Sequence, residues 1–459
     1  MSFRFPLDPA RLLALALSCA QVGCARERAT EAPTVGVAPI AATAPMPETG
    51  ALRAPAEPTW VAPAVKPIEG VEGPAAGERQ LVLAAVGDVL LHGPVQASAE
   101  ALEGRYRALF ASIEPELQAP HLTFANLETP ISPEGAAAGA MSFNAPAEVL
   151  DALRDVGVDV VSVANNHIFD RGRRGLDATL EHLAAARLSA VGAGIPPQEA
   201  GPLVLEAEDI RVGFLAWTQV LNREFTHCRA GKPCAQVAVL REWAPALAQV
   251  REVAPQVDLL VVSLHWGIEY ALQPGEDQRT FAKLLVQAGA DVVLGHHPHV
   301  PQQIEVIRRK DGSVGVVAYS LGNLISNQSR GYRAGKDPKE VGATRDGVLL
   351  RVAAARTPEV AGAPRSRARL VGMDALQLWT ENRVRAGDLP AIEVVATDTA
   401  LATVQQSLVS ATGTERRGLL NARRLYAERQ AFMREVLGES MLRAPGPLTP
   451  GPKLTLSSD

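Results

Sequence analysis

Apolar runs alternate with helical patterns from about residue 80 onward. Near-continuous apolar runs predict buried strands over residues 80–87, 121–126, 158–165, 210–218, 257–266 and 290–295. Apolar residues at helical spacing predict helices over residues 97–117, 145–157, 175–187, 240–254 and 276–289. Residues 302–323 predict a hairpin that turns at Asp311-Gly312, and residues 346–355 predict one more strand. This alternation, with strands apolar on both sides, predicts an α/β fold whose sheets are covered on both faces.

The N-terminus has the pattern of an export signal. The apolar run "LLALALSCAQVG" follows Arg11 and is too short to span a bilayer, as in a signal peptide. Cys24 follows directly after Val-Gly and resembles the lipidated cysteine of a bacterial lipoprotein, although Gln21 stands where an aliphatic residue is usual. Cys19 is a weaker alternative. We expect an exported protein, anchored to a membrane through Cys24 and located in the periplasm or at the cell surface.

The chain divides into four expected parts. Residues 1–24 are the signal peptide, and residues 25–78 are a Pro- and Ala-rich linker without helical or strand periodicity. Residues 79–356 form the folded domain. Residues 357–459 form a C-terminal extension with one charged helix, "LLNARRLYAERQAFMREVLG", and a disordered tail.

Composition excludes one class of partner. The formal net charge is −5, and aromatic residues make up 4% of the chain, so neither a basic face nor a set of stacking platforms for nucleic acid is indicated.

Side chains able to bind metals gather at the carboxyl ends of the predicted strands. These ends are where open α/β sheets build their sites. They carry Asp88, Asn126, Glu128, Asn165, Asn166, His167, His265, His296, His297 and His299. Each could alone be a turn residue or a satisfied polar group, but five of nine histidines fall in these segments. Oxygen and imidazole ligands without thiolates suit Mn, Fe, Zn or Mg, so we expect a divalent metal site.

The segments over residues 81–355 resemble the CapA-like family, named for a poly-γ-glutamate capsule biosynthesis protein. The matching segments are "VGD", "FANLETPI", "GVDVVSVANNHIFDRGRRGLDATLEHL", "GAG", "VVSLHWGIEY", "AGADVVLGHHPHVPQQIEV" and "AYSLGN". This family is a branch of the calcineurin-like metallophosphoesterases. The resemblance implies a sandwich of two β-sheets flanked by helices, with two divalent ions at the strand ends.

The resemblance also implies residue roles. By motif, the metal-ligand positions are Asp88, Glu128, Asn166, His265, His297 and His299. His167 matches a general acid; alternatively it only packs against the site or supports Asn166. The residues expected to line the site without ligating are Asn126, Asn165, His296 and Asn323. Many phosphoesterases carry Asp-x-His at the first strand, but Leu90 holds the third position here.

Two local features refine this assignment. Pro298 stiffens the turn between His297 and His299, so both imidazoles can face inward. Asp170, three residues after His167, can orient that ring as part of a catalytic pair.

Cys228 and Cys234 are close in sequence and are expected to form a disulfide. Exported proteins meet oxidising conditions, in which such a pair usually bridges. A metal clip with the adjacent His227 is the rival, although a second Cys or His pair is missing.

We expect an exported metal-dependent hydrolase of capsule or cell-envelope polymer metabolism, acting on an anionic polymer or a phosphoester. Two alternatives stay open. The protein could be a hydrolase or transferase acting on the γ-amide backbone of the polymer, or a non-catalytic binding or assembly factor with structural metals. A capsule-export complex is a possible partner in each case.

Overall fold

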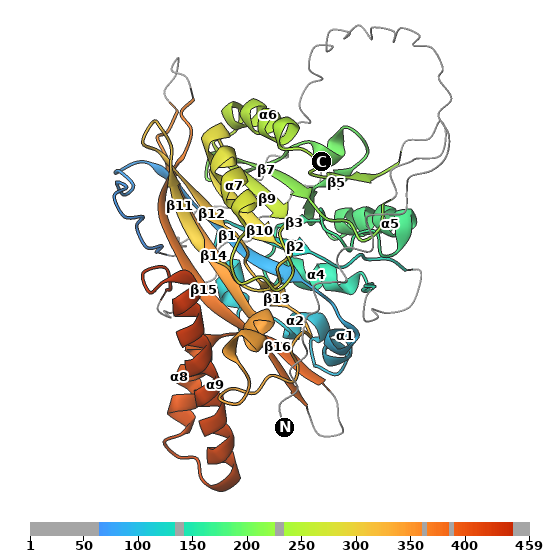
Figure 1. Cartoon of the computed structure of the whole chain (residues 1–459), viewed down its shortest axis with the longest axis vertical. Helices are drawn as coiled ribbons and strands as arrows, with labels where there is room; N and C mark the ends of the chain where they lie inside the picture. The colour runs from blue at the N-terminus through green and yellow to red at the C-terminus, as the bar shows by residue number, and fades with distance from the viewer. Residues whose placement is uncertain (1–63, 134–141, 225–233, 360–364, 385–389, 444–459) are drawn as a thin grey trace, which may run out of the picture. The chain divides into compact units, whose positions relative to one another are not determined.

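The computed structural model describes residues 64–133, 142–224, 234–359, 365–384 and 390–443. They form two large β-sheets with helices outside them (Figure 1). The expected signal peptide and most of the expected linker lie outside the described residues. Among the described residues, no helix has the length and apolarity to cross a bilayer.

The larger sheet has eight strands. In spatial order it contains β16 (Pro390–Ala396), β15 (Arg369–Val384), β14 (Asp346–Arg356), β1 (Arg79–Val89), β2 (Leu122–Leu127), β3 (Val160–Ser162) and β4 (Ser189–Val191), while β13 (Asn323–Ile325) also pairs with β1. The strands from β1 to β4 run parallel, as does β13 beside β1, whereas β14 to β16 are antiparallel. The carboxyl ends of β1, β2, β3 and β13 therefore meet at one edge.

The second sheet has six strands. In order these are β11 (Ile304–Arg308), β12 (Val314–Ala318), β10 (Val292–His296), β9 (Leu259–His265), β7 (Ile210–Thr218) and β6 (Leu203–Ala207). The four central strands are parallel. The expected hairpin is confirmed, because β11 and β12 are antiparallel across the turn at Gly312. A small third sheet pairs β5 (Ala193–Gly194) with β8 (Gln236–Val237).

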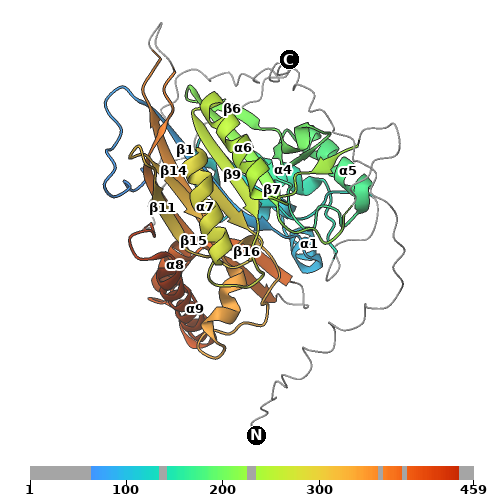
Figure 2. The same cartoon turned by 45° about the horizontal axis from the view of Figure 1, so that its top comes forward.

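Alternate residues of one strand serve two cores, as the period of a strand requires. In β7, Phe214 belongs to the core between the two sheets, where its ring stacks on Phe124 of β2, with ring centroids 6.0 Å apart. The next residue, Leu215, belongs to the core beneath the helices α6 (Trp243–Val253) and α7 (Glu276–Ala288). Figure 2 shows α6 and α7 lying along this sheet. The expected α/β sandwich of two sheets flanked by helices is thus confirmed.

The described residues also contain seven further α-helices and three short 3-10 helices. They are α1 (Gly93–Glu100), α2 (Arg105–Ala108), α3 (Glu114–Gln118), α4 (Glu148–Asp155), α5 (Gly172–Ala185), α8 (Thr397–Ser407) and α9 (Gly413–Leu437), with the 3-10 helices η2 (Gln198–Ala200), η3 (Ala254–Gln256) and η4 (Lys339–Arg345). The expected single helix over 97–117 is wrong. Gly104 has φ 86° and Arg105 has φ 49°, and this left-handed backbone separates α1 from α2. Residues 109–113 then separate α2 from α3.

The end of the expected linker is part of the fold. Pro67 forms an antiparallel bridge with Gly372 of β15, and the Lys66 N–H donates to Asp374 Oδ2 at 3.2 Å. Ile68 is buried in the main core. The ordered region therefore includes residues 64–78, which the Pro-rich composition assigned to the linker.

The region after residue 356 differs from the expected surface extension. It supplies β15 and β16 to the larger sheet, in addition to a helix close to the expected one. Polar residues interrupt the apolar pattern of β15: Asp374 receives two hydrogen bonds from Arg351 of β14, at 2.8 and 2.7 Å, and both side chains are buried. Because this buried ion pair places charged residues at core positions, the sequence of β15 lacks the continuous apolar run by which a buried strand is predicted.

Helix α9 is fastened to the larger sheet by a second buried ion pair. The Arg429 guanidinium donates to both carboxylate oxygens of Asp346, at the start of β14, and both side chains are fully buried. Burial raises the pKa of Asp346 to about 6, against the opposing effect of Arg429. Removal of one partner would leave an uncompensated charge in the interior.

We predict that Arg429→Met lowers the free energy of unfolding by about 3–5 kcal/mol, because Asp346 would be buried without its cation. Chemical denaturation of the intact chain measures this loss. Arg434→Met is the matched control, since Arg434 on the same helix pairs with Glu439 at the surface and should cost at most about 1 kcal/mol. Equal effects of the two changes would contradict the structural role of the buried pair.

Candidate metal centre

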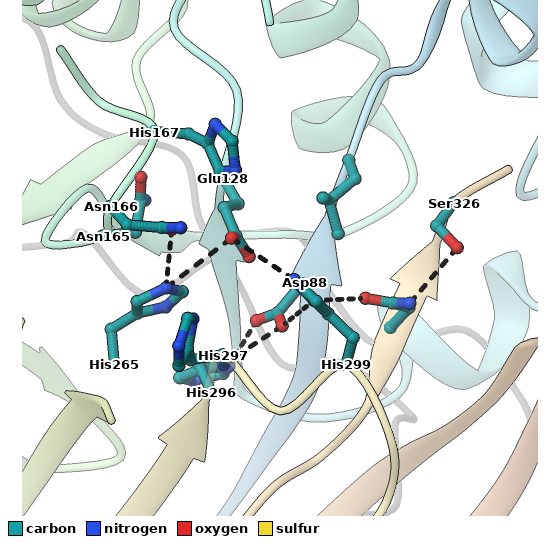
Figure 3. Close-up of polar contacts among 12 residues, drawn as sticks. Asp88, Glu128, Asn165, Asn166, His167, His265, His296, His297, His299 and Ser326 are labelled. Atoms are coloured by element: carbon teal, nitrogen blue, oxygen red, sulfur yellow. Dashed lines mark hydrogen bonds and ion pairs between the residues drawn. The ribbon is translucent and has the colours of Figure 1, made fainter. Parts of the chain in front are cut away.

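Strand register brings the predicted residues together at one edge of the two sheets. Asp88 of β1 lies beside Asn126 of β2 and beside Asn323 of β13. In the other sheet, His265 at the end of β9 lies beside His296 at the end of β10. Gly295, the residue before His296, permits the close approach of the Tyr319 backbone, because a Cβ there would lie 1.9 Å from the Tyr319 carbonyl oxygen. Figure 3 shows the side chains converging from both sheets.

The Asp88 carboxylate is the most connected group of the cluster. Asn126 Nδ2 donates to Oδ1 at 2.9 Å, and the ring nitrogens Nδ1 of His296 and His299 each lie 3.1 Å from one of its oxygens. The His297 N–H donates to Oδ2 at 3.3 Å. Burial alone would raise the pKa of Asp88, but the hydrogen bonds with His296 and His299 hold it well below its usual value. Asp88 is therefore an anion in a fully buried place.

Glu128 is buried with one long hydrogen bond, which Asn126 Nδ2 donates to its Oε2 at 3.4 Å. Its Oε1 accepts no hydrogen bond, and the nearest cationic candidates are Nε2 of His265 at 3.6 Å and Nε2 of His299 at 3.8 Å. Burial, followed by the charge of Asp88, raises the pKa of Glu128 well above its usual value. Two adjacent buried carboxylates without an arginine or lysine among these contacts are stable as anions only if a cation joins them.

Asn166 and His265 present their ligand atoms to the same point. Asn166 Oδ1 lies 2.9 Å from His265 Nε2. Burial, followed by the charge of His297, lowers the pKa of His265 well below its usual value. A neutral imidazole is the form of histidine that binds metals.

The strained turn at His297-Pro298-His299 sets both rings in the cluster. His297 has φ 96° and His299 has φ 60°, and such positive values are uncommon for residues other than glycine. The His297 ring centroid lies 4.8 Å from that of His265 and 6.1 Å from that of His299. Burial, followed by the charge of His299, lowers the pKa of His297 to about 4, and its buried Nδ1 has no hydrogen-bond partner.

The donor set fits a divalent cation. Ligand atoms of Glu128, His297 and His299 lie within 4.8 Å of one another, as do those of Asp88, Glu128 and His265. Glu128 Oε1 and His297 Nδ1 are buried polar atoms without hydrogen bonds, a state that is costly unless an ion or water completes it. All six residues predicted as ligands lie in the cluster. Their role as ligands stays a prediction.

His167 and Asp170 form a pair at the side of the cluster. His167 Nδ1 lies 2.8 Å from Asp170 Oδ2, which also accepts the Phe143 N–H at 2.6 Å. The Phe143 ring packs edge-on against the imidazole, with centroids 4.5 Å apart. The ring is thereby fixed with Nδ1 toward the carboxylate.

The residues expected to line the centre support its ligands. Asn126 bridges Asp88 and Asn165, and Asn165 Nδ2 donates to the Leu127 carbonyl at 2.8 Å. Asn323 Oδ1 lies 3.1 Å from His299 Nδ1. Leu90, at the position of the missing histidine, is buried in the apolar core.

Four residues near the centre had no role in the sequence analysis. Asn222 Oδ1 accepts from Asn166 at 3.4 Å, and Asn222 Nδ2 lies 3.4 Å from His167 Nδ1. Tyr270 is exposed, and its ring centroid lies 6.1 Å from that of His299. The others are Phe143 and Gln328. Asn222 could have been found, because it follows the end of a predicted strand; the other three come from loops with no pattern.

The cysteines are only partly described. Cys234 is disulfide-bonded, which agrees with the expected bridge. Cys228, its expected partner, and Cys24, the expected lipidation site, lie outside the described residues.

Curated relatives share part of this chain. The capsule biosynthesis protein CapA of Bacillus anthracis is 30% identical over 289 residues, which are 61% of this chain and 66% of that protein. The PGA biosynthesis protein CapA of Bacillus subtilis is 30% identical over 248 residues, which are 53% of this chain and 62% of that protein. A probable polyglutamine synthesis accessory protein of Mycobacterium tuberculosis is 34% identical over 218 residues, 44% of this chain and 54% of that protein. The match thus spans less than two thirds of each relative.

Solved structures of similar fold are more distant. A novel phosphatase from Mycoplasma pneumoniae matches with TM-score 0.38 and 13% identity over 65% of this chain and 94% of its own. A putative 5'-nucleotidase from Staphylococcus aureus matches with TM-score 0.38 and 13% identity over 67% of this chain and 56% of its own.

The range that matches a known family covers the whole candidate centre. Residues 82–328, more than half of the chain, match the family described as bacterial capsule synthesis protein PGA_cap. That range includes every residue of the cluster, from Asp88 to Asn323. The chain therefore belongs to the PGA_cap family of bacterial capsule synthesis proteins.

Proposed function

We propose that this protein is an exported, metal-dependent hydrolase of capsule or cell-envelope polymer metabolism, which acts by phosphoesterase-type chemistry. The observation that carries the proposal is the buried set of carboxylate, amide and imidazole ligands beside an oriented His-Asp pair. Membership of the capsule synthesis family and the names of the relatives support the polymer context.

The residues that would hold the ions are Asp88, Glu128, Asn166, His265, His297 and His299. The two groups of converging ligand atoms share Glu128, which supports a pair of ions rather than one. A divalent ion in this place would act as a Lewis acid on an ester oxygen. The ligand types are compatible with Mn, Fe, Zn or Mg.

His167 would deliver a proton to the leaving group. With Nδ1 held by Asp170, the transferable proton resides on Nε2. As the ester bond breaks, that proton passes to the departing oxygen, and Asp170 stabilises the imidazolium before transfer. The edge-on contact with Phe143 restricts the ring to this orientation.

A substrate screen on metal-loaded protein separates this proposal from its rivals. Turnover of phosphodiesters supports phosphoesterase chemistry. Release of glutamate oligomers from poly-γ-glutamate would instead support action on the γ-amide backbone. Tight binding of the polymer with no turnover of any ester or amide would support an assembly factor with structural metals.

We also propose that Cys24 is lipidated and that the Pro-rich segment after it holds the folded domain away from the membrane. The short apolar run ending in Val-Gly-Cys supports this proposal.

We predict that His299→Ala lowers the metal content of the protein from about two ions per chain, because it removes an imidazole next to Asp88 and Glu128. Elemental analysis of protein purified without chelators measures this. His182→Ala is the control, since His182 lies on α5 and is not among the converging ligands. An unchanged metal content in His299→Ala would contradict the ligand assignment.

We predict that His167→Ala keeps its metals but loses about 10²–10⁴-fold in kcat on an alkyl phosphodiester, whose poor leaving group needs a proton. The loss should be much smaller on a nitrophenyl phosphodiester, whose leaving group departs unaided. Asp170→Asn should show the same contrast in weaker form.

Equal losses of His167→Ala on both substrates, with metals retained, would argue against the general acid. Loss of metal together with activity would move His167 into the ligand set.

We predict that Cys24→Ser releases the protein from the membrane fraction, because the lipid attachment point is removed. Fractionation of cells, followed by detection of the protein, measures this. Cys19→Ser should leave the protein membrane-bound. If Cys24→Ser stays as firmly in the membrane fraction as the wild type, the anchor is elsewhere.

A further inference from the structure

Helix α9 carries an arginine face that the candidate metal centre does not use. At 3.6 residues per turn, one side of the helix collects five arginines over a length of about 27 Å. They are Arg416, Arg417, Arg423, Arg424 and Arg434, and all five are exposed. The buried Arg429 lies on the other side, against the sheet. Figure 1 shows α9 (red) with α8 as a hairpin beside the larger sheet.

The charge of this face is not neutralised by neighbouring carboxylates. In the part of the chain that the structure describes, only Arg434 of the five forms an ion pair, with Glu439. Arg416 donates to the Leu408 carbonyl at 2.8 Å, and Arg417 donates to Thr414 Oγ1 at 3.0 Å. Helix α9 has six arginines and three glutamates, in a chain whose formal net charge is −5. Helix α9 therefore carries a net positive charge, although the chain as a whole is negative.

The loop over residues 329–336 extends the positive surface. Arg330, Arg333 and Lys336 are exposed. Of these three, Arg333 forms an ion pair with Asp337. The loop lies against α9: the Gly335 N–H donates to Glu428 Oε2 at 2.8 Å, and the Arg424 side chain packs close to Gly335. We refer to the five arginines of α9 together with Arg330, Arg333 and Lys336 as the basic track.

The same loop leads directly to the candidate metal centre. Gln328 precedes the basic part of the loop, and its Oε1 accepts from Asn323 Nδ2 at 2.9 Å. Asn323 Oδ1 in turn lies 3.1 Å from His299 Nδ1. Gln328 Nε2 also lies 3.5 Å from the hydroxyl of Tyr270, the exposed aromatic residue next to His299. The basic track and the metal centre are thus joined by a short stretch of chain.

We propose that the basic track binds a chain of repeated carboxylates and directs it toward the metal centre. This inference rests on the proposed function in polymer metabolism, and it concerns where the polymer is held, not which of its bonds is broken. Guanidinium groups pair with carboxylates through two parallel hydrogen bonds, and arginine is the residue best suited to that task. Cations repeated along a helix and a loop match an anion repeated along a polymer.

The composition of the face favours a polymer over a membrane surface. Helices that lie in a membrane interface insert large apolar and aromatic side chains. In α9 the aromatic side chains Tyr426 and Phe432 are buried against the protein. Leu420, on the same side of α9 as the five arginines, is a large apolar side chain that is 36% exposed. The face therefore offers charge without a surface for insertion.

The test compares two triple variants of the intact chain for binding of fluorescently labelled poly-γ-glutamate, measured by anisotropy. The first variant combines Arg416→Gln, Arg417→Gln and Arg423→Gln. The control combines Arg187→Gln, Arg251→Gln and Arg308→Gln, three exposed arginines away from α9. We expect the first variant to lose about tenfold in affinity at low salt, from three exposed charge pairs, and the control to bind like the wild type.

Three further readouts make the result specific. Binding by the wild type should weaken with salt, and the first variant should show a shallower salt dependence. Arg330→Gln with Lys336→Gln, in the loop rather than the helix, should also weaken binding. His167→Ala should bind the polymer like the wild type, so that loss of turnover and loss of binding are told apart.

Equal affinities of the two triple variants, or no binding by the wild type, would overturn the proposal. The proposal would also be overturned if the protein bound phosphatidylglycerol vesicles through the basic track but did not bind poly-γ-glutamate. Thermal melting of each variant checks that it is folded. If the triple variant in α9 is unfolded, the loop variant still tests whether the basic track binds the polymer.

Discussion

The burial of two neighbouring carboxylates governs the organisation of this protein. Asp88 and Glu128 lie at the ends of adjacent parallel strands, both are inaccessible to solvent, and their polar contacts are with imidazoles and amides rather than with arginine or lysine. Such an arrangement repels itself in a medium of low polarity. Two surrounding features lessen that repulsion: the N–H groups of Asn126 and His297 that donate to Asp88, and the strained turn that brings the His297 and His299 rings into the cluster. A divalent cation bound by both carboxylates would offset this repulsion.

The two-sheet architecture is the means by which ligands far apart in sequence reach this point. β1, β2 and β13 deliver Asp88, Glu128 and Asn323 from one sheet, while β9 and β10 deliver His265 and the His296–His299 turn from the other. Strand length and register fix these positions, and the close backbone approach at Gly295 leaves no room for a side chain. The His167–Asp170 pair differs in origin, since both residues come from one local turn and depend less on how the sheets pack.

Much of the fold and of the cluster could be predicted, because both follow from patterns within short stretches of the sequence. Near-continuous apolar runs marked β1, β2, β7, β9 and β10, and the polar residues directly after them are those that converge. The misses have physical causes. β15 carries Asp374, whose carboxylate can be buried because it pairs with Arg351 of another strand, and the sequence does not reveal that partner. The helix expected over 97–117 is interrupted by the left-handed backbone at Gly104, which apolar spacing does not reveal. Tyr270 and Gln328 reach the centre from loops, whose course is decided by tertiary contacts.

The pairing of β1 with β14 bears on how the boundaries of this protein are drawn. The stretch that matches the family ends at residue 328, yet β1 hydrogen-bonds along residues 79–85 to a strand that begins at Asp346. Asn323 likewise donates to the Thr344 carbonyl, beyond the matched stretch. A protein cut at residue 328 would therefore expose one side of its central strand and lose support for His299. The unit recognisable by sequence is smaller than the unit that can fold, and an expression fragment or domain fusion must extend through α9 to remain intact.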